Sequence, residues 1–270
     1  MYLLAQNQDG ENQMKVKSPL RYPGGKTRAM SKILPHIPKG VDICSPFFGG
    51  GSIEIAYAVA NPDNKVYGYD IFEPIVCFWK QLIKDPVRLA NKIEVIKRDF
   101  DKESFIEFRE ELKENFIPCR DTAAKVFAIN RSSFSGATFS GGFSKMSSEK
   151  RFTQSSIDRV RNFKAPNLSV ALSSFEDTIK KHKNEFLYLD PPYLLQKGSN
   201  NLYGSNGSTH KGFDHEGLAE LLKDRKGWLM SYNDCEWIRE AYSGFRIEDV
   251  DWSYGMNKTK KSSEVLIFSE

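Results

Sequence analysis

The chain has 270 residues, enough to bury a sizeable core as one large domain or as one domain with an insertion. No run approaches the roughly 20 apolar residues that a membrane span needs, and residues 1–17 lack the layout of a signal peptide. The four cysteines lie far apart and form neither a metal-type pair nor a disulfide framework, so we expect no metal and a reducing, cytoplasmic setting. A net charge of +4 permits a polyanionic partner without requiring one.

Residues 1–17 are expected to form a loose leader, and strand-like and helix-like segments alternate after it. The alternation begins with a short buried strand, a glycine-rich turn, a helix, a second strand and a second helix, at residues 41–44, 47–52, 53–60, 65–69 and 74–84. This βαβα order predicts a parallel sheet with crossover helices. Later strands are expected at 168–172, 185–189 and 228–231, with a closing antiparallel hairpin at 245–250 and 264–268.

The middle of the chain, residues 91–164, breaks this alternation. Residues 99–115 and 123–129 have helical periodicity, whereas 130–148 are rich in Ser, Gly and Phe and fit neither a helix nor a strand. We interpret 130–148 as loops or a glycine-bearing hairpin. The sequence therefore predicts an α/β sheet domain, built from residues 18–90 and 165–270, that carries a mainly helical insertion at 91–164.

The most informative peptide is Asp190-Pro191-Pro192-Tyr193, which directly follows the apolar run 185–189. The pattern predicts a buried strand that stops in a rigid turn, and ligands of open α/β sheets bind outside such strand ends. The turn offers a carboxylate, proline carbonyls and an aromatic ring. That set suits a planar amino group on a heterocycle, although a purely structural strand-end turn is the better explanation when the four residues are taken alone.

A second candidate site is the turn Gly49-Gly50-Gly51, between a predicted strand and helix. Glycine there lets the backbone approach a ligand closely. Asp70 ends the next strand, about 20 residues later, where dinucleotide-binding folds place an acid that binds ribose hydroxyls. The turn lacks the G-x-G-x-x-G spacing, which favours a smaller adenosyl cofactor over a dinucleotide.

The segment 21–27 contains Gly-Gly-Lys-Thr, which is similar to the end of a phosphate-binding P-loop. Leu20 occupies the position where that loop requires its first glycine, so the sequence argues against an ATP-dependent enzyme. Lys26 could instead face a cofactor carboxylate, and Tyr22 could cover an adenine or methionyl group. The alternative is a simple glycine turn that opens a helix near Thr27.

In this order, the motifs resemble the Dam-type (D12 class) DNA adenine-N6 methyltransferases from about Ser18 to the C-terminus. The resemblance rests on residues 19–26, 45–52, Asp70, Asn130-Arg131 with Phe134 and Gly136, 190–193 and 231–234. It implies a Rossmann-like methyltransferase sheet, S-adenosylmethionine as cofactor, and double-stranded DNA as the partner from which one adenine is flipped. We expect a monomer, because no large apolar stripe is left unassigned.

The resemblance also implies roles for individual residues. The catalytic motif is Asp190, Pro191, Pro192 and Tyr193. The residues expected to bind the cofactor are Tyr22, Lys26, Phe48, Gly49, Gly50, Asp70, Phe175 and Asp190. The residues expected to bind DNA, several of them through phosphates, are Asn130, Arg131, Lys145, Lys258, Lys260 and Lys261, and each of these charges could equally be a solvated surface group.

Three features depart from the family pattern. Ser45 stands where family members commonly carry an acid that contacts the methionyl end of the cofactor. The segment Ser173-Ser174-Phe175 lacks the acid often found before the phenylalanine of the second cofactor wall. The insertion also lacks the arginine-bearing hairpin typical of enzymes that read GATC, so the target need not be GATC.

Two alternatives keep the same residues but change the function. Cytosine N4 has the same amino geometry as adenine N6, although enzymes that methylate it more often carry Ser in place of Asp190; RNA or a protein glutamine amide are further acceptors. A DNA-binding module that has lost catalysis, through the changes at Ser45 and Ser174, is the other alternative. Binding of S-adenosylmethionine distinguishes this module from an enzyme.

Overall fold

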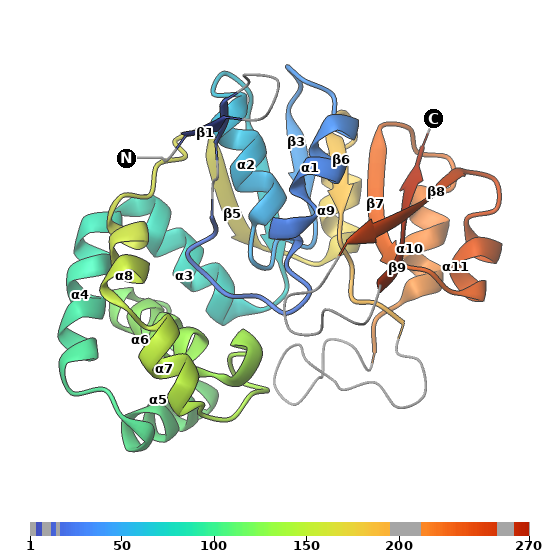
Figure 1. Cartoon of the computed structure of the whole chain (residues 1–270). Helices are drawn as coiled ribbons and strands as arrows, with labels where there is room; N and C mark the ends of the chain where they lie inside the picture. Colours follow the sequence, from blue (N-terminus) through green and yellow to red (C-terminus); the bar gives the residue numbers. More distant parts are fainter. Residues whose placement is uncertain (1–3, 7–11, 15–16, 195–211, 253–261, 270) are drawn as a thin grey trace.

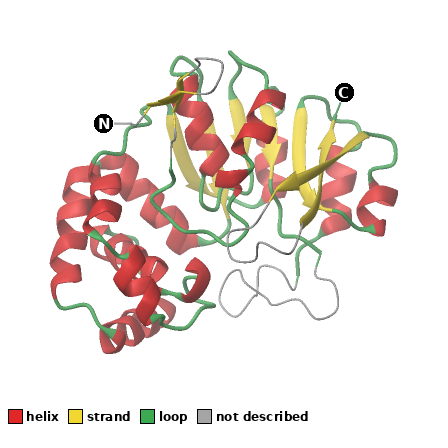
Figure 2. Ribbon diagram, viewed as in Figure 1, coloured by secondary structure: helices red, strands yellow, loops and turns green. Residues whose placement is uncertain are grey.

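In the computed structural model of the chain, residues 4–6, 12–14, 17–194, 212–252 and 262–269 are described. Their centre is a seven-stranded sheet with the strand order β5-β4-β3-β6-β7-β9-β8. The first five strands in this order are parallel, whereas β9 is antiparallel to both of its neighbours. Figures 1 and 2 show the sheet with helices on both faces and a separate group of helices at one side.

The strands of this sheet are β3 (Ile43–Ser45), β4 (Val66–Asp70), β5 (Leu168–Leu172), β6 (Phe186–Leu189), β7 (Trp228–Asn233), β8 (Arg246–Trp252) and β9 (Ser262–Phe268). Each lies where the sequence predicted a strand, so the Rossmann-like sheet and its closing antiparallel hairpin are confirmed. Within the expected leader, β1 (Leu4–Gln6) and β2 (Asn12–Met14) form a small antiparallel pair that the sequence did not predict.

The helices are η1 (Lys26–Arg28), α1 (Met30–Ile33), η2 (Leu34–His36), α2 (Ser52–Ala60), α3 (Glu73–Lys84), α4 (Pro86–Arg98), α5 (Lys102–Glu114), α6 (Arg120–Ser132), η3 (Phe134–Gly136), α7 (Lys145–Arg151), α8 (Gln154–Arg161), α9 (Phe175–Lys181), α10 (His215–Leu222) and α11 (Glu236–Ala241). The sequence predicted α2, α3, α5 and α6. It did not predict the short helices after β5, β6 and β7.

Alternate residues of the central strands face two separate cores, because successive side chains of a strand point to opposite faces. In β6, Leu187 and Leu189 join the core beneath α9, α10 and α11, whereas Tyr188 joins the core shared with α2 and α3. The domain is therefore a sheet between two helical layers. The central parallel strands β3, β4, β6 and β7 are buried on both faces, whereas the edge strand β5 exposes Ser169 and Leu172.

Helices α4 to α8 gather beside the sheet, to the left in Figure 1. Two aspartates begin the first two of these helices: Asp85 accepts the Arg88 N–H of α4 at 3.0 Å, and Asp101 accepts the Ser104 N–H of α5 at 2.8 Å. Because Asp85 caps α4, the group begins at Pro86, slightly before the predicted insertion. Residues 133–144 form a short 3-10 turn and one bridge, between Ser133 and Phe143, as the predicted loops require. The predicted loop segment 130–148 was too long, because α6 continues to Ser132 and α7 begins at Lys145, where Ser144 caps it.

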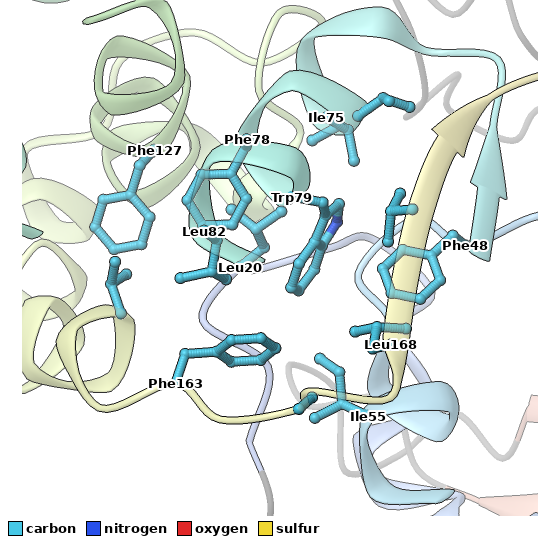
Figure 3. Close-up of a cluster of buried hydrophobic side chains, with 14 of the residues drawn as sticks. Leu20, Phe48, Ile55, Ile75, Phe78, Trp79, Leu82, Phe127, Phe163 and Leu168 are labelled. Atoms are coloured by element: carbon cyan, nitrogen blue, oxygen red, sulfur yellow. The ribbon is translucent and has the colours of Figure 1, made fainter. Parts of the chain in front are cut away.

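Aromatic side chains join the helical group to the sheet (Figure 3). The Phe78 ring of α3 stacks on Phe127 of α6 with centroids 5.7 Å apart, and Trp79 meets Phe48 edge-on at 5.1 Å. The Phe48 ring, 2% exposed, lies directly over Gly68 of β4, where a Cβ would come within 2.2 Å of it. Gly68 therefore leaves the space in which the Phe48 ring supports the glycine-rich loop.

We expect Gly68→Ala to destabilise the protein by about 1–3 kcal/mol, because its methyl group would overlap the confined Phe48 ring. Urea unfolding measures the change in the free energy of unfolding. Gly244→Ala is the matched control, since nothing lies within 4 Å of a Cβ there. Equal stability of the two variants would show that the Phe48 ring can move away without cost.

Candidate functional site

A cavity of about 530 Å³ opens at the carboxyl ends of β3, β4 and β6. This is the edge where ligands bind in open α/β sheets, and the volume suits a small molecule. It brings together three segments that are far apart in the sequence: the η1 region, the glycine-rich loop after β3, and the turn after β6. Its lining includes all the predicted catalytic and cofactor-binding residues.

Asp190 lies in this cavity directly after β6. Its Oδ1 atom accepts hydrogen bonds from Lys26 Nζ at 2.6 Å and Ser231 Oγ at 3.1 Å, with the Tyr193 hydroxyl at 3.4 Å. The Lys26 side chain is 3% exposed, so this is a shielded ion pair. Among the described residues no donor contacts Asp190 Oδ2, which leaves that oxygen available to a ligand.

The pairing of Lys26 also bears on the P-loop alternative. Lys26 Nζ donates to the Gly24 carbonyl at 3.1 Å as well as to Asp190, and it lies 4.9 Å from the centre of the Tyr193 ring. Its ammonium group is thus directed to the turn after β6. That arrangement differs from a lysine that extends to nucleotide phosphates, and it agrees with the missing first glycine at Leu20.

The turn after β6 is held by residues of β7 and β9. The Tyr232 hydroxyl lies 3.2 Å from the Pro192 carbonyl and accepts the Leu194 N–H at 3.0 Å. The Tyr193 hydroxyl donates to Oε2 of the buried Glu264 at 2.9 Å. Tyr193 is therefore fixed at its hydroxyl, while its ring lines the cavity.

The glycine-rich loop is shaped by Tyr22 and Asp70. Gly49 has a positive φ of +45°, and a Cβ there would lie 2.8 Å from the Tyr22 ring, so only glycine allows this packing. The Gly49 N–H donates to Asp70 Oδ2 and the Phe72 N–H to Oδ1, both at 2.8 Å. Burial raises the pKa of Asp70, and these two N–H groups oppose that rise.

One end of the cavity is aromatic. Phe175, at the start of α9, lies 5.7 Å from Phe47 and 5.2 Å from Phe213 between ring centroids. Ser174 caps α9 by accepting the Asp177 N–H at 3.2 Å, so in this structure its hydroxyl serves the helix. Phe48 contributes to the lining, but its ring packs in the core against Trp79. Phe48 thus supports the loop from beneath.

The described charged residues that line the cavity are unbalanced. Lys26 is the single cation among them, whereas the carboxylates are Glu54, Asp70, Glu176, Asp190 and Asp214. Glu54, in the first turn of α2, is 2% exposed. Its pKa is raised to about 7, chiefly by burial; the Asp190 charge also raises it, and the Ser45 side chain and Lys26 act in the opposite direction. The cavity therefore favours a cationic or neutral ligand over an anion.

Asn130 has a different role from the DNA contact that the sequence predicted. Its side chain is buried: Oδ1 accepts the Arg21 N–H at 2.9 Å, and Nδ2 donates to the Arg21 and Gly136 carbonyls at 2.6 and 3.1 Å. The amide joins the 21–26 segment to the loop after α6. In this conformation Asn130 is structural, because its hydrogen-bonding groups are used inside the protein.

Arg131 is also buried, with 7% exposure, and its Nε donates to the Arg151 carbonyl at the end of α7 at 2.8 Å. Burial, followed by repulsion from Arg159, Arg21 and Arg151, lowers the pKa of Arg131 to about 9. Lys145 is exposed at the start of α7. Lys258, Lys260 and Lys261 lie outside the described residues.

Sequence reasoning missed four side chains that the structure places around Asp190 and Tyr193: Glu54, Ser231, Tyr232 and Glu264. Glu54 had a recognisable signal, since it is an acid between two isoleucines in an otherwise apolar helix. Ser231 and Tyr232 belong to the segment 231–234, which contributed to the family resemblance but had no predicted role. Glu264 had no signal, because its position depends on the antiparallel pairing of β9 with β7.

The site combines the features of an adenosyl-binding α/β methyltransferase, and comparison with known proteins agrees. The family model for D12 class N6 adenine-specific DNA methyltransferases matches residues 22–256, and the chain belongs to this family. Among its relatives are the type II methyltransferase M.MjaIII of Methanocaldococcus jannaschii (24% identical, covering 88% of this chain and 91% of that protein) and a DNA adenine methylase of Vibrio cholerae (24% identical, 87% and 88%).

The modification methylase StsI of Streptococcus sanguinis is 27% identical over 93% of this chain, which spans 42% of that longer protein.

In the described part of the chain, no helix is both long enough and apolar enough to cross a membrane. The same residues contain no cluster of three or more His, Cys, Asp or Glu side chains suited to a metal ion.

Glu54 makes stability depend on pH. Its pKa is raised in the folded state, so the folded protein binds more protons than the unfolded one, and stability falls as pH rises from about 4.5 to about 7. We expect Glu54→Gln to be more stable than wild type at pH 8, by on the order of 3 kcal/mol, and to lose this advantage near pH 5. Thermal melts at the two pH values measure the difference; a gain independent of pH would contradict this explanation.

Proposed function

We propose that the cavity binds S-adenosylmethionine and an adenine flipped out of duplex DNA, and that Asp190 directs methyl transfer to the adenine N6. The observation that carries this proposal is the position of Asp190. It lies at the carboxyl end of β6 in a cavity shared with the glycine-rich loop, and its Oδ2 accepts no hydrogen bond from a described residue. An adenine amino group needs such an acceptor.

The cavity suits S-adenosylmethionine at both ends. The aromatic end, formed by Phe47, Phe175 and Phe213, would take the adenine ring, and Asp70 still has lone pairs for a ribose hydroxyl beside the glycine-rich loop. The excess of carboxylates suits a molecule that carries a sulfonium and an ammonium. When bound, S-adenosylmethionine supplies an electrophilic methyl group.

The turn after β6 would then present the acceptor base. Tyr193, held by Glu264, would stack on the flipped adenine, an interaction that contributes about 1–3 kcal/mol per base. Asp190 and the Pro191 carbonyl would accept the two N6–H bonds. These bonds draw the nitrogen lone pair out of conjugation with the ring and aim it along the line of attack. Asp190 would also stabilise the positive charge that develops on N6 as the N–C bond forms and the sulfonium S–C bond breaks to leave a neutral thioether, and it would then accept the proton that N6 loses.

Lys26 would hold the Asp190 carboxylate in the orientation that accepts the N6–H bond. Its ion pair at 2.6 Å uses Oδ1, and Ser231 adds a second contact to the same oxygen. The carboxylate is thus fixed from one side while the other side faces the cavity. Flipping costs a few kcal/mol, so a preformed acceptor that needs no rearrangement reduces the remaining barrier.

We expect Asp190→Ala to abolish methyl transfer, because it removes the main acceptor for N6 while leaving the sheet intact. Incorporation of tritium from labelled S-adenosylmethionine into unmethylated duplex DNA measures the activity, and circular dichroism checks the fold. Asp224→Asn, which removes an exposed carboxylate beyond the end of α10, is the control and should retain activity. Normal turnover by Asp190→Ala would exclude this role.

The product identifies the acceptor. Digestion of the labelled DNA to nucleosides, followed by mass spectrometry, should yield N6-methyladenine. N4-methylcytosine would instead support the alternative acceptor on the same fold. No methylation together with no binding of S-adenosylmethionine would favour a DNA-binding module that has lost catalysis.

We further propose that the helical group formed by α4 to α8 is the target-recognition region, with arginines near α6 to α8 facing the DNA backbone. Arg21, Arg131, Arg151 and Arg159 repel one another, and Arg151 is exposed. Such a cluster is stabilised when it neutralises phosphates and releases counterions. The buried Arg131 would act indirectly by fixing the end of α7 through the Arg151 carbonyl.

We expect Arg151→Gln to weaken DNA binding and to reduce the slope of log affinity against log salt by about 1, the contribution of one phosphate contact. Fluorescence anisotropy with labelled duplex at several salt concentrations measures both quantities. Lys223→Gln is the matched control, because Lys223 follows α10 at the opposite edge of the sheet from the cavity. An unchanged slope in Arg151→Gln would place the DNA elsewhere.

A further inference from the structure

At Ser45 this chain lacks the acid that commonly contacts the methionyl end of the cofactor in this family. A different carboxylate, that of Glu54, lies beside Ser45. Ser45 lies at the end of β3 and is fully buried. Glu54, nine residues later, lines the same cavity from the first turn of α2. The Ser45 side chain faces the Glu54 carboxylate. The two positions are therefore neighbours in space: the strand end carries a serine, and the helix carries an acid.

Glu54 is a costly residue if it has no ligand. Its neighbours along the helix, Ile53 and Ile55, are both 1% exposed, and the nearby cation, Lys26, is already paired with Asp190 at 2.6 Å. Ser45 offers Glu54 a hydrogen bond but no positive charge. A buried carboxylate without a cation of its own destabilises a protein, and such perturbed groups gather at functional sites. The position of Glu54 in a cavity rich in carboxylates indicates that the missing partner is a cation.

We propose that Glu54 binds the ammonium group of the methionyl moiety of S-adenosylmethionine, in place of the acid absent at Ser45. This inference rests on the proposed function and adds a residue to it. Glu54 lies near Lys26 and Asp190 and lines the same cavity as Phe47 and Phe175. With the adenine against the aromatic rings, the amino-acid end of the cofactor would be the part that Glu54 contacts.

The proposal makes cofactor affinity depend on pH. The groups that face Glu54 are Lys26 from η1, Ser45 from β3, and Tyr188 and Asp190 from β6 and the turn after it. Below about pH 7 Glu54 takes up a proton and loses the charge that attracts an ammonium. Affinity for a ligand with an ammonium group should therefore fall by up to about tenfold per pH unit below 7.

The experiment compares two ligands by isothermal titration calorimetry. S-adenosylhomocysteine carries the ammonium and carboxylate, whereas 5′-methylthioadenosine has the same adenosine thioether without them. Glu54→Gln should bind S-adenosylhomocysteine about 10- to 100-fold more weakly than wild type, the range expected for one charge-assisted hydrogen bond, and should bind 5′-methylthioadenosine within twofold. Asp224→Asn should match wild type with both ligands.

A rescue separates a binding role from a structural one. The double variant Ser45→Glu with Glu54→Gln returns the acid to the strand end and should recover most of the affinity for S-adenosylhomocysteine. Equal losses for both ligands in Glu54→Gln, or no loss for either, would overturn the proposal. If the variants fail to fold, the wild-type protein still tests it, because only the affinity for S-adenosylhomocysteine should fall between pH 8 and pH 6.

The same titrations distinguish a wrong role for Glu54 from a wrong assignment of the cavity as the S-adenosylmethionine site. If the wild-type protein binds neither adenosyl ligand at any pH, the cavity is not an adenosylmethionine site. If wild type binds both ligands but Glu54→Gln leaves their affinity ratio unchanged, the cofactor proposal stands. In that case the role of Glu54 is wrong, and another group binds the ammonium.

Discussion

The ion pair between Lys26 and Asp190 is the interaction on which the site depends. It joins residues 164 positions apart in the sequence, and both partners are at least partly shielded from water. Such a pair requires good geometry to offset its loss of hydration, and here the Gly24 carbonyl and Ser231 hydroxyl complete it. The segment before η1, which belongs to no strand of the sheet, is thereby fixed over the end of β6.

The same segment is also held by the helical insertion. Asn130 bonds both the N–H and the carbonyl of Arg21, and a Cβ at Gly136 would lie 2.6 Å from the Arg21 side chain. A movement of α6 would therefore be transmitted to residues 21–26 and from there to Asp190. The proposed contact of the helical group with DNA and the placement of the Asp190 carboxylate are therefore connected through one buried amide.

The sequence predicted those parts of the fold that depend on local patterns. Apolar runs located every strand of the central sheet, and the glycine-rich loop and the turn after β6 meet in one cavity because the carboxyl ends of parallel strands share an edge. Asn130 shows where this reasoning stops. An asparagine beside an arginine at the start of a serine-rich segment looks accessible to DNA, but Asn130 lies in α6 and its amide is buried against Arg21 and Gly136.

Glu264 and Glu54 could not have been placed from sequence for a related reason. Glu264 reaches Tyr193 because β9 inserts between β7 and β8, a pairing that joins residues far apart in the chain. Glu54 was visible as an unusual acid in an apolar helix, but its proximity to Ser45 depends on how α2 packs on β3. In both cases the missing information is long-range packing, which residue periodicity does not contain.

The cavity and the group of arginines around Arg131 carry charge of opposite sign, so they favour different ligands. The described lining of the cavity carries one lysine against five carboxylates, whereas Arg21, Arg151 and Arg159 gather around Arg131 outside that lining. A phosphate is attracted to the arginines and repelled by the cavity, while a neutral base can enter it. For the proposed complex, this distribution favours the DNA backbone at the arginines and an uncharged base in the cavity beside Asp190. The overall charge of +4 conceals this division, because the two sets largely cancel when they are summed.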